Sequence, residues 1–221
     1  NSPPVISSVT ITPSSGVTTS TALTCSETSS DADNDSLTIV FEWDIDGASA
    51  GTGSTLTLTP SIASPNSVVT CTVTAEDGTD SSTDSASVNV DNSPPIVNTV
   101  TLTPDPAYTD DTMVASTSGS DSDNQTVALT YEWLVNGTPI QNGGSNTLDG
   151  TLFVKGDSVS VSVTPNDGID DGLPVSAGPI TIQNSSPSQP SLQIIPSAPV
   201  EGVDDLICDI TLASVDADLD V

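Results

Sequence analysis

The stretch VTCTVT at residues 69–74 decides the fold, because apolar side chains alternate there with threonine. A two-residue period is that of a strand with one buried face and one exposed face. The stretch VISSVTIT at residues 5–12 has the same period, and no part of the chain spaces its apolar residues as a helix would. The sequence therefore predicts an all-β protein, although its hydrophobic content is only 34%.

The same sequence landmarks return in the same order about 90 residues later, which makes internal repetition the main organising feature. The returning pairs are NSPPVI at 1–6 and NSPPIV at 92–97, DADN at 31–34 and DSDN at 121–124, FEW at 41–43 and YEW at 131–133, and EDG at 76–78 and NDG at 166–168. Looser third returns are NSSP at 184–187 and DAD at 216–218. We therefore expect one repeat at 1–91, a second at 92–183, and the opening part of a third at 184–221.

Each full repeat is expected to hold six or seven short strands separated by Gly, Pro, Asn and Asp clusters, which favour turns. The expected strands lie near 5–12, 21–27, 37–45, 53–59, 67–76 and 84–91 in the first repeat, and near 190–196 and 205–212 in the third. This number of antiparallel strands in about 90 residues suits a two-sheet sandwich. Proline pairs at 3–4 and 94–95 stiffen the links. The prediction is a series of antiparallel β-sandwiches arranged end to end.

Several of these segments resemble the tandem immunoglobulin-like repeats of bacterial and archaeal surface proteins, which are related to the PKD-like and cadherin-like groups. The resemblance rests on DNSPP at 91–95, YEWLVNG at 131–137, DADND at 31–35 and CTVTAEDG at 71–78, and it covers essentially the whole chain. It implies an immunoglobulin-like sandwich used as a stalk, adhesin, filament component or spacer. The full cadherin linker motif is missing, so the resemblance alone does not imply calcium.

The cysteines of the first repeat follow the immunoglobulin order, in which a tryptophan packs against a disulfide between the two sheets. Cys25, Trp43 and Cys71 fall on the second, third and sixth strands. The second repeat has Ala115 and Val161 at the two cysteine positions, as expected if the sulfurs are partners. A Cys25–Cys71 disulfide is predicted, with two buried free thiols as the alternative. The disulfide would place the protein outside the cytoplasm, in an extracellular or cell-surface location.

Two further observations concern the odd cysteine and the tryptophans. Cys208 lies on the second strand of the third repeat, so its partner is expected beyond Val221. Trp43 and Trp133 occupy equivalent strand positions, which predicts core residues. Stacking of these tryptophans on a sugar is the alternative.

Carboxylates alternate at Asp31, Asp33 and Asp35, so that a turning loop can direct their oxygens at one point. Calcium takes 6–8 oxygen ligands in irregular geometry, which makes it the expected cofactor. In a sandwich of this topology other acidic loops and the incoming linker reach the same end of the domain. The further candidate ligands are Asp77, Asp91, Asn92, Asp121, Asp123 and Asp167, followed in the third repeat by Asp216, Asp218 and Asp220. The alternative is that these aspartates are solvated turn residues.

Charge and composition limit the possible functions. The chain has a formal net charge of −29 from 30 acidic residues against one Lys+Arg, and it contains no histidine. It therefore lacks the cations that nucleic acids require and the histidine of common nucleophilic triads. No apolar run is long enough to insert in a membrane. We expect a non-enzymatic structural protein, a segment of a cell-surface stalk or filament, whose partners are neighbouring repeats or copies of itself. An adhesin that recognises glycan or protein, and a passive spacer beside a secreted enzyme, remain alternatives.

Overall fold

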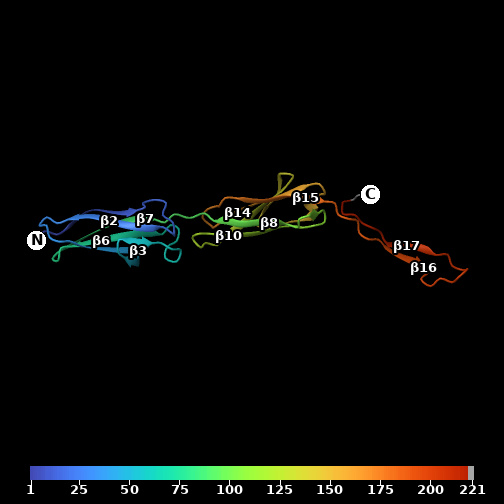
Figure 1. The fold of residues 1–221 in the computed structure, drawn as a ribbon, viewed down its shortest axis with the longest axis horizontal. Helices are drawn as coiled ribbons and strands as arrows, with labels where there is room; N and C mark the ends of the chain where they lie inside the picture. The colour runs from blue at the N-terminus through green and yellow to red at the C-terminus, as the bar shows by residue number, and fades with distance from the viewer. Residues whose placement is uncertain (219–221) are drawn as a thin grey trace. The chain divides into compact units, whose positions relative to one another are not determined.

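The computed structural model describes residues 1–218, and within them strands are the regular elements apart from one short 3-10 turn, η1 (Gly150–Leu152) (Figure 1). The chain divides into two compact units. The first comprises Asn1–Ile96, Ser120–Ala128 and Asn166–Gly172, and the second comprises Val97–Gly119, Leu129–Pro165 and the chain from Leu173 onward. Among the described residues, no helix has the length and apolar content that a membrane crossing requires.

The first repeat is a sandwich of two antiparallel sheets. Its strands are β1 (Val5–Thr12), β2 (Ala22–Ser30), β3 (Thr38–Ile45), β4 (Ala48–Thr52), β5 (Thr55–Thr57), β6 (Val68–Glu76) and β7 (Ser81–Asn89). One sheet has the order β1-β2-β5 and the other the order β4-β3-β6-β7. The predicted all-β, immunoglobulin-like class is therefore confirmed, and six of these strands overlap the six predicted ranges.

β4 is the strand that sequence reasoning missed. Its sequence ASAGT has no alternating large apolar side chains, and all of its residues are exposed or half-buried. It forms because Asp46 and Gly47 both adopt positive φ, of 52° and 81°, which is the geometry of a two-residue hairpin turn. That turn folds β4 back onto β3, so local turn chemistry rather than burial creates the strand.

The second repeat uses the same plan with one addition. Its strands are β8 (Ile96–Thr103), β9 (Ala107–Tyr108), β10 (Met113–Ser120), β11 (Ala128–Val135), β12 (Thr138–Gly143), β13 (Thr147–Leu148), β14 (Ser158–Asn166) and β15 (Val175–Gln183). The sheets have the orders β13-β10-β8 and β12-β11-β14-β15-β9. β9 pairs in parallel with β15, Ala107 opposite Ile182. In the first repeat the N–H of Asp91 donates to the carbonyl of Val17 at 2.6 Å in the corresponding place.

The part of the third repeat that the structure describes is a single antiparallel hairpin. It consists of β16 (Ser191–Ile195) and β17 (Ile207–Leu212), at the two positions expected from the sequence. Every residue of both strands is exposed. Cys208, on β17, is a free exposed thiol.

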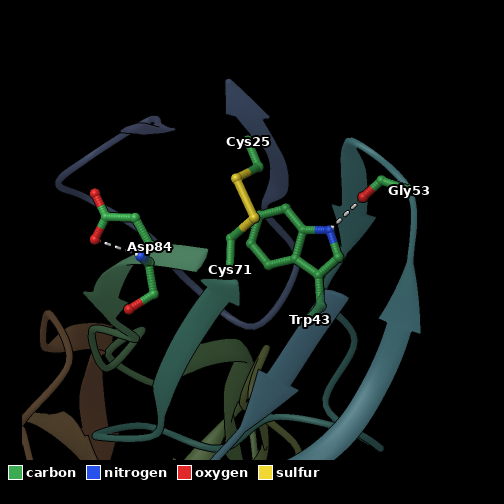
Figure 2. Close-up of a disulfide and its surroundings, with 6 residues drawn as sticks. Cys25, Trp43, Gly53, Cys71 and Asp84 are labelled. Carbon is green, nitrogen blue, oxygen red and sulfur yellow. Dashed lines mark hydrogen bonds between the residues drawn. A yellow bond between two sulfur atoms is a disulfide. The ribbon is translucent and has the colours of Figure 1, made fainter. Parts of the chain in front are cut away.

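The core of each full repeat is built around its tryptophan. In the first repeat Cys25 and Cys71 form a disulfide, and the indole of Trp43 lies beside it (Figure 2). The indole Nε1 donates a hydrogen bond to the carbonyl of Gly53 at 2.8 Å. In the second repeat Trp133 is 0% exposed and donates in the same way to Ser145 at 3.1 Å. Both tryptophans are therefore buried, which leaves neither available for stacking on a sugar.

Candidate metal site and loop contacts

The loop that follows β2 gathers three carboxylates. Asp31, Asp33 and Asp35 each place one oxygen within 4.8 Å of the others, and within residues 1–218 this is the one such group of three. Asp31 sets the loop's shape, because its Oδ1 accepts the N–H of Asp33 at 2.8 Å and of Asp35 at 3.2 Å. Its other oxygen, Oδ2, is buried and has no hydrogen-bond donor among the described residues. A buried, unpaired carboxylate oxygen is costly unless a ligand satisfies it.

Residues 1–4 precede β1, and the first two of them contact two acidic loops. We call each equivalent Asn-Ser pair a lead-in: Asn1-Ser2, Asn92-Ser93 and Asn184-Ser185. The N–H of Ser2 donates to Oδ2 of Asp33 at 2.6 Å. The amide of Asn1 donates to Oδ2 of Asp77 at 2.9 Å and to Oδ2 of Asp80 at 3.1 Å. Hydrogen bonds from the backbone of Asp80, the side chain of Asn1 and the backbone of Thr79 lower the pKa of Asp77.

The second repeat reproduces this arrangement with one carboxylate fewer. Oδ1 of Asp121 accepts the N–H of Asp123 at 2.7 Å and of Gln125 at 3.3 Å, while Oδ2 of Asp121 is again buried without a donor in the described chain. The N–H of Ser93 donates to Oδ2 of Asp123 at 2.7 Å. Gln125 stands where the first repeat has Asp35, so the third negative charge is missing here.

The lead-in of the second repeat joins the loop after β14 in the same way. The amide of Asn92 donates to Oδ2 of Asp167 at 2.8 Å and to Oδ2 of Asp170 at 2.9 Å. Burial raises the pKa of Asp167, but the hydrogen bonds from Asn92 and from the backbone of Asp170 and Ile169 outweigh it and lower the pKa. The predicted approach of Asn92 to Asp167 is therefore present, as a hydrogen bond between side chains.

The remaining predicted ligands fall in different surroundings. In the third repeat Oδ1 of Asp216 accepts the N–H of Asp218 at 2.8 Å, and Oδ2 of Asp218 accepts the N–H of Ser185 at 2.6 Å. Asp220 lies outside the described residues. Asp91 is exposed, and the hydrogen bonds found within residues 1–218 do not connect its carboxylate to either acidic loop.

Sequence reasoning missed the hydroxyl donors. Thr19 is 0% exposed and donates from Oγ1 to Oδ1 of Asp123, and both residues belong to the first compact unit. In the second unit Thr109 donates from Oγ1 to Oδ1 of Asp218. Thr19 and Thr109 are 90 residues apart, which matches the repeat spacing and could have identified them. Threonine is so frequent in this chain that this match did not stand out.

The one lysine lies in a hydrogen-bonded turn of the second compact unit. The ammonium of Lys155 donates to Oδ1 of Asn184 at 3.2 Å. The turn is closed by Asp157, whose Oδ2 accepts the N–H of Val154 at 2.8 Å and whose N–H donates to the carbonyl of Val154 at 3.1 Å.

The sheet orders and the disulfide beside a buried tryptophan define the chain as a tandem of immunoglobulin-like β-sandwich repeats. Among solved structures, 48 chains resemble it. The fibronectin(III)-like modules of Clostridium thermocellum CbhA are 18% identical, with 80% of this chain and 94% of that chain covered and a TM-score of 0.29.

Tandem domains of titin are 11% identical, with 82% of this chain covered and a TM-score of 0.34. The match covers 61% of that titin chain, which is less than two thirds of its length. No protein-family model matches the chain, and no curated protein matches it.

Proposed function

We propose that this chain is a structural segment of an extracellular stalk or filament, built by copying one immunoglobulin-like module. The observation that carries the proposal is the threefold recurrence of one backbone contact. A lead-in serine N–H meets the second aspartate of the following Asp-x-Asp loop in Ser2–Asp33, Ser93–Asp123 and Ser185–Asp218. Reuse of one contact is typical of proteins whose length grows by adding modules. The disulfide supports an oxidising, extracellular location.

Self-association is part of this proposal, and β16 and β17 supply its surface. Leu192, Ile194 and Ile210 are 58%, 57% and 63% exposed on a hairpin of only two strands. An isolated two-stranded hairpin is at best marginally stable, and exposed apolar patches mark sites of association. Strands that complete this third repeat would cover the same face, and we propose that in the 221-residue chain a second copy supplies them.

Sedimentation velocity over a range of protein concentrations tests the association. The wild-type chain should form species larger than the monomer, and Ile194→Asp with Ile210→Asp should reduce them. Val5→Asp is the matched control, because Val5 is 59% exposed on β1 and lies outside the hairpin. A wild-type chain that stays monomeric at every concentration would exclude self-association through this hairpin.

Calcium is the proposed ion of the first acidic loop. Asp31, Asp33 and Asp35 offer oxygen ligands alone, which is the donor set that calcium prefers. The buried Oδ2 of Asp31 has no donor from residues 1–218, so the loop fits a cation. When bound, the ion would neutralise the cluster and fix the loop beside the lead-in.

Calorimetric unfolding of the full chain in millimolar calcium and in excess chelator tests this site. A ligand that binds the native state stabilises it by mass action, so the midpoint of the first repeat should rise with calcium. Asp33→Asn with Asp35→Asn should abolish the rise. Asp84→Asn is the control, because it removes one carboxylate from β7, where Asp84 accepts the N–H of Ser85. An equal rise with magnesium or sodium would show screening of charge instead of a calcium site.

A further inference from the structure

One hydrogen bond links the first repeat to the acidic loop of the second inside the first compact unit. The hydroxyl of Thr19 donates to Oδ1 of Asp123, and the two side chains are 0% and 6% exposed. The other oxygen of the same carboxylate accepts the N–H of Ser93 at 2.7 Å. Hydrogen bonds to a carboxylate are stronger than those between neutral groups, and burial makes the loss of one partner costly.

The same three-part contact recurs inside the second compact unit. Thr109 donates its hydroxyl to Oδ1 of Asp218, while the N–H of Ser185 donates to Oδ2 at 2.6 Å. Thr19 and Thr109 occupy equivalent positions, each six residues before the cysteine position of the second strand, Cys25 or Ala115. Two occurrences in one chain, with the same atoms in the same roles, show that the contact belongs to the repeat plan.

The equivalent positions in the first and third repeats are consistent with a contact that belongs to the repeat plan. In the first repeat Asp33 accepts the N–H of Ser2 and is exposed, and the hydrogen bonds of residues 1–218 give it no threonine donor. In the third repeat the position six residues before Cys208 is Gly202, which has no hydroxyl to donate. The accepting aspartate and the donating threonine are therefore separate features, and a repeat can have the aspartate without the threonine.

We propose that this threonine–aspartate pair is the contact by which one repeat recognises its successor. The partner that fits the Asp-x-Asp end of a repeat is then another immunoglobulin-like repeat with a hydroxyl residue at the Thr19 position. The pairing couples the stability of successive repeats, because breaking it leaves Oδ1 of Asp123 with only the longer hydrogen bond from the hydroxyl of Ser93, at 3.3 Å.

The test is a double-mutant cycle on the full chain with an isosteric change. Thr19→Val removes the hydroxyl and keeps the shape, whereas Thr19→Ser keeps the hydroxyl. Thr19→Val should raise the unfolding equilibrium constant about tenfold, as expected for a hydrogen bond to a charged group. Thr19→Ser should restore most of the loss, and Asp123→Ala, which removes the acceptor, should make Thr19→Val nearly silent. Additive effects of Thr19→Val and Asp123→Ala would overturn the proposal.

A second readout separates recognition from a purely local role of Thr19. In a Trp43→Phe background, the fluorescence of Trp133 reports denaturant unfolding of the second repeat alone. Thr19→Val, a change in the first repeat, should lower that midpoint, whereas Thr24→Val at an exposed site on β2 should not. No shift in the Trp133 transition would contradict coupling between repeats. If Thr19→Val fails to fold, Thr109→Val with Asp218→Ala provides an independent cycle with the same two outcomes.

Discussion

At the scale of residues, the two full repeats fill the same two core positions with different side chains. Cys25 and Cys71 in the first repeat correspond to Ala115 and Val161 in the second, and all four side chains are buried beside a tryptophan. The second repeat shows that the sandwich closes without a sulfur bridge. The disulfide therefore adds a covalent constraint to a core that already packs.

Replacement of the bridge by the second repeat's own residues tests this view. Cys25→Ala with Cys71→Val should fold, and it should lower the stability of the first repeat by about 4 kcal/mol on the chain-entropy model. Thermal unfolding under oxidising conditions measures the difference. Cys208→Ser is the control, because Cys208 is a free exposed thiol. An unchanged midpoint would mean that the bridge does not constrain the unfolded chain.

Acid should destabilise the lead-in contacts through Asp77 and Asp167. Both carboxyl groups have a pKa below the ordinary value of 3.8 in the folded chain. A lowered folded pKa gives a contribution that is complete above the unfolded pKa and is lost as the pH falls through the folded pKa. Stability should therefore fall as the pH drops below about 4.

The acid dependence can be assigned by comparing two substitutions that remove one negative charge each. Asp167→Asn should flatten the acid side of a plot of unfolding free energy against pH. Asp84→Asn controls for the change in net charge. Identical acid slopes for Asp167→Asn and the wild-type chain would refute the assignment.

At the scale of elements, sequence periodicity predicted the strands that bury one face. β6 was predictable because Val69, Cys71, Val73 and Ala75 alternate with exposed or half-buried residues. β4 was not, because it has no buried face and depends on a hairpin turn. β9 could not be predicted from the sequence either, because two residues are too few to show a periodicity. Their pairing with β15 depends on the tertiary fold.

Gly178, in β15, combines a positive φ with too little room for a side chain. Its φ is 91°, and a Cβ atom there would lie 2.8 Å from the carbonyl oxygen of Val159 and 3.0 Å from Leu102. The β14–β15 register shifts between Val159 and Val161, so glycine serves an irregular point of the ladder. Gly178→Ala should destabilise the second repeat by more than about 1 kcal/mol.

Chemical denaturation with a paired variant measures the cost at Gly178. Gly144→Ala is the control, because a Cβ there meets nothing within 4 Å. Equal midpoints for the two variants would show that the β14–β15 ladder rearranges without cost.

In the candidate site, as among the strands, the features that could be predicted from the sequence are those with a local pattern or a position set by the topology. The Asp31–Asp35 loop and the approach of Asn92 to Asp167 were predictable, because alternating carboxylates and sandwich topology place them. The hydroxyls of Thr19 and Thr109 were not, because their partners lie 104 and 109 residues away in sequence. Contacts of that separation leave no local pattern among so many threonines.

At the scale of the whole molecule, a net charge of −29 makes self-repulsion a general term in stability. Salt screens exposed charges that lie more than about 10 Å apart at 0.1 M. Added sodium chloride should therefore raise the thermal midpoint of the full chain, even with a chelator present. Replacing Asp84 and Asp105 by asparagine should reduce the rise. A midpoint independent of salt would mean that the carboxylates are too widely spaced to matter.

The turn that holds Lys155 has a consequence for the survival of the chain among proteases. Enzymes that cleave after lysine or arginine find one target bond in all 221 residues, the bond between Lys155 and Gly156. Such enzymes need an extended substrate, whereas the N–H of Gly156 is bonded to the carbonyl of Ile182 at 2.9 Å. The native protein should therefore resist trypsin, and its slow cleavage into two fragments would measure how often this turn opens.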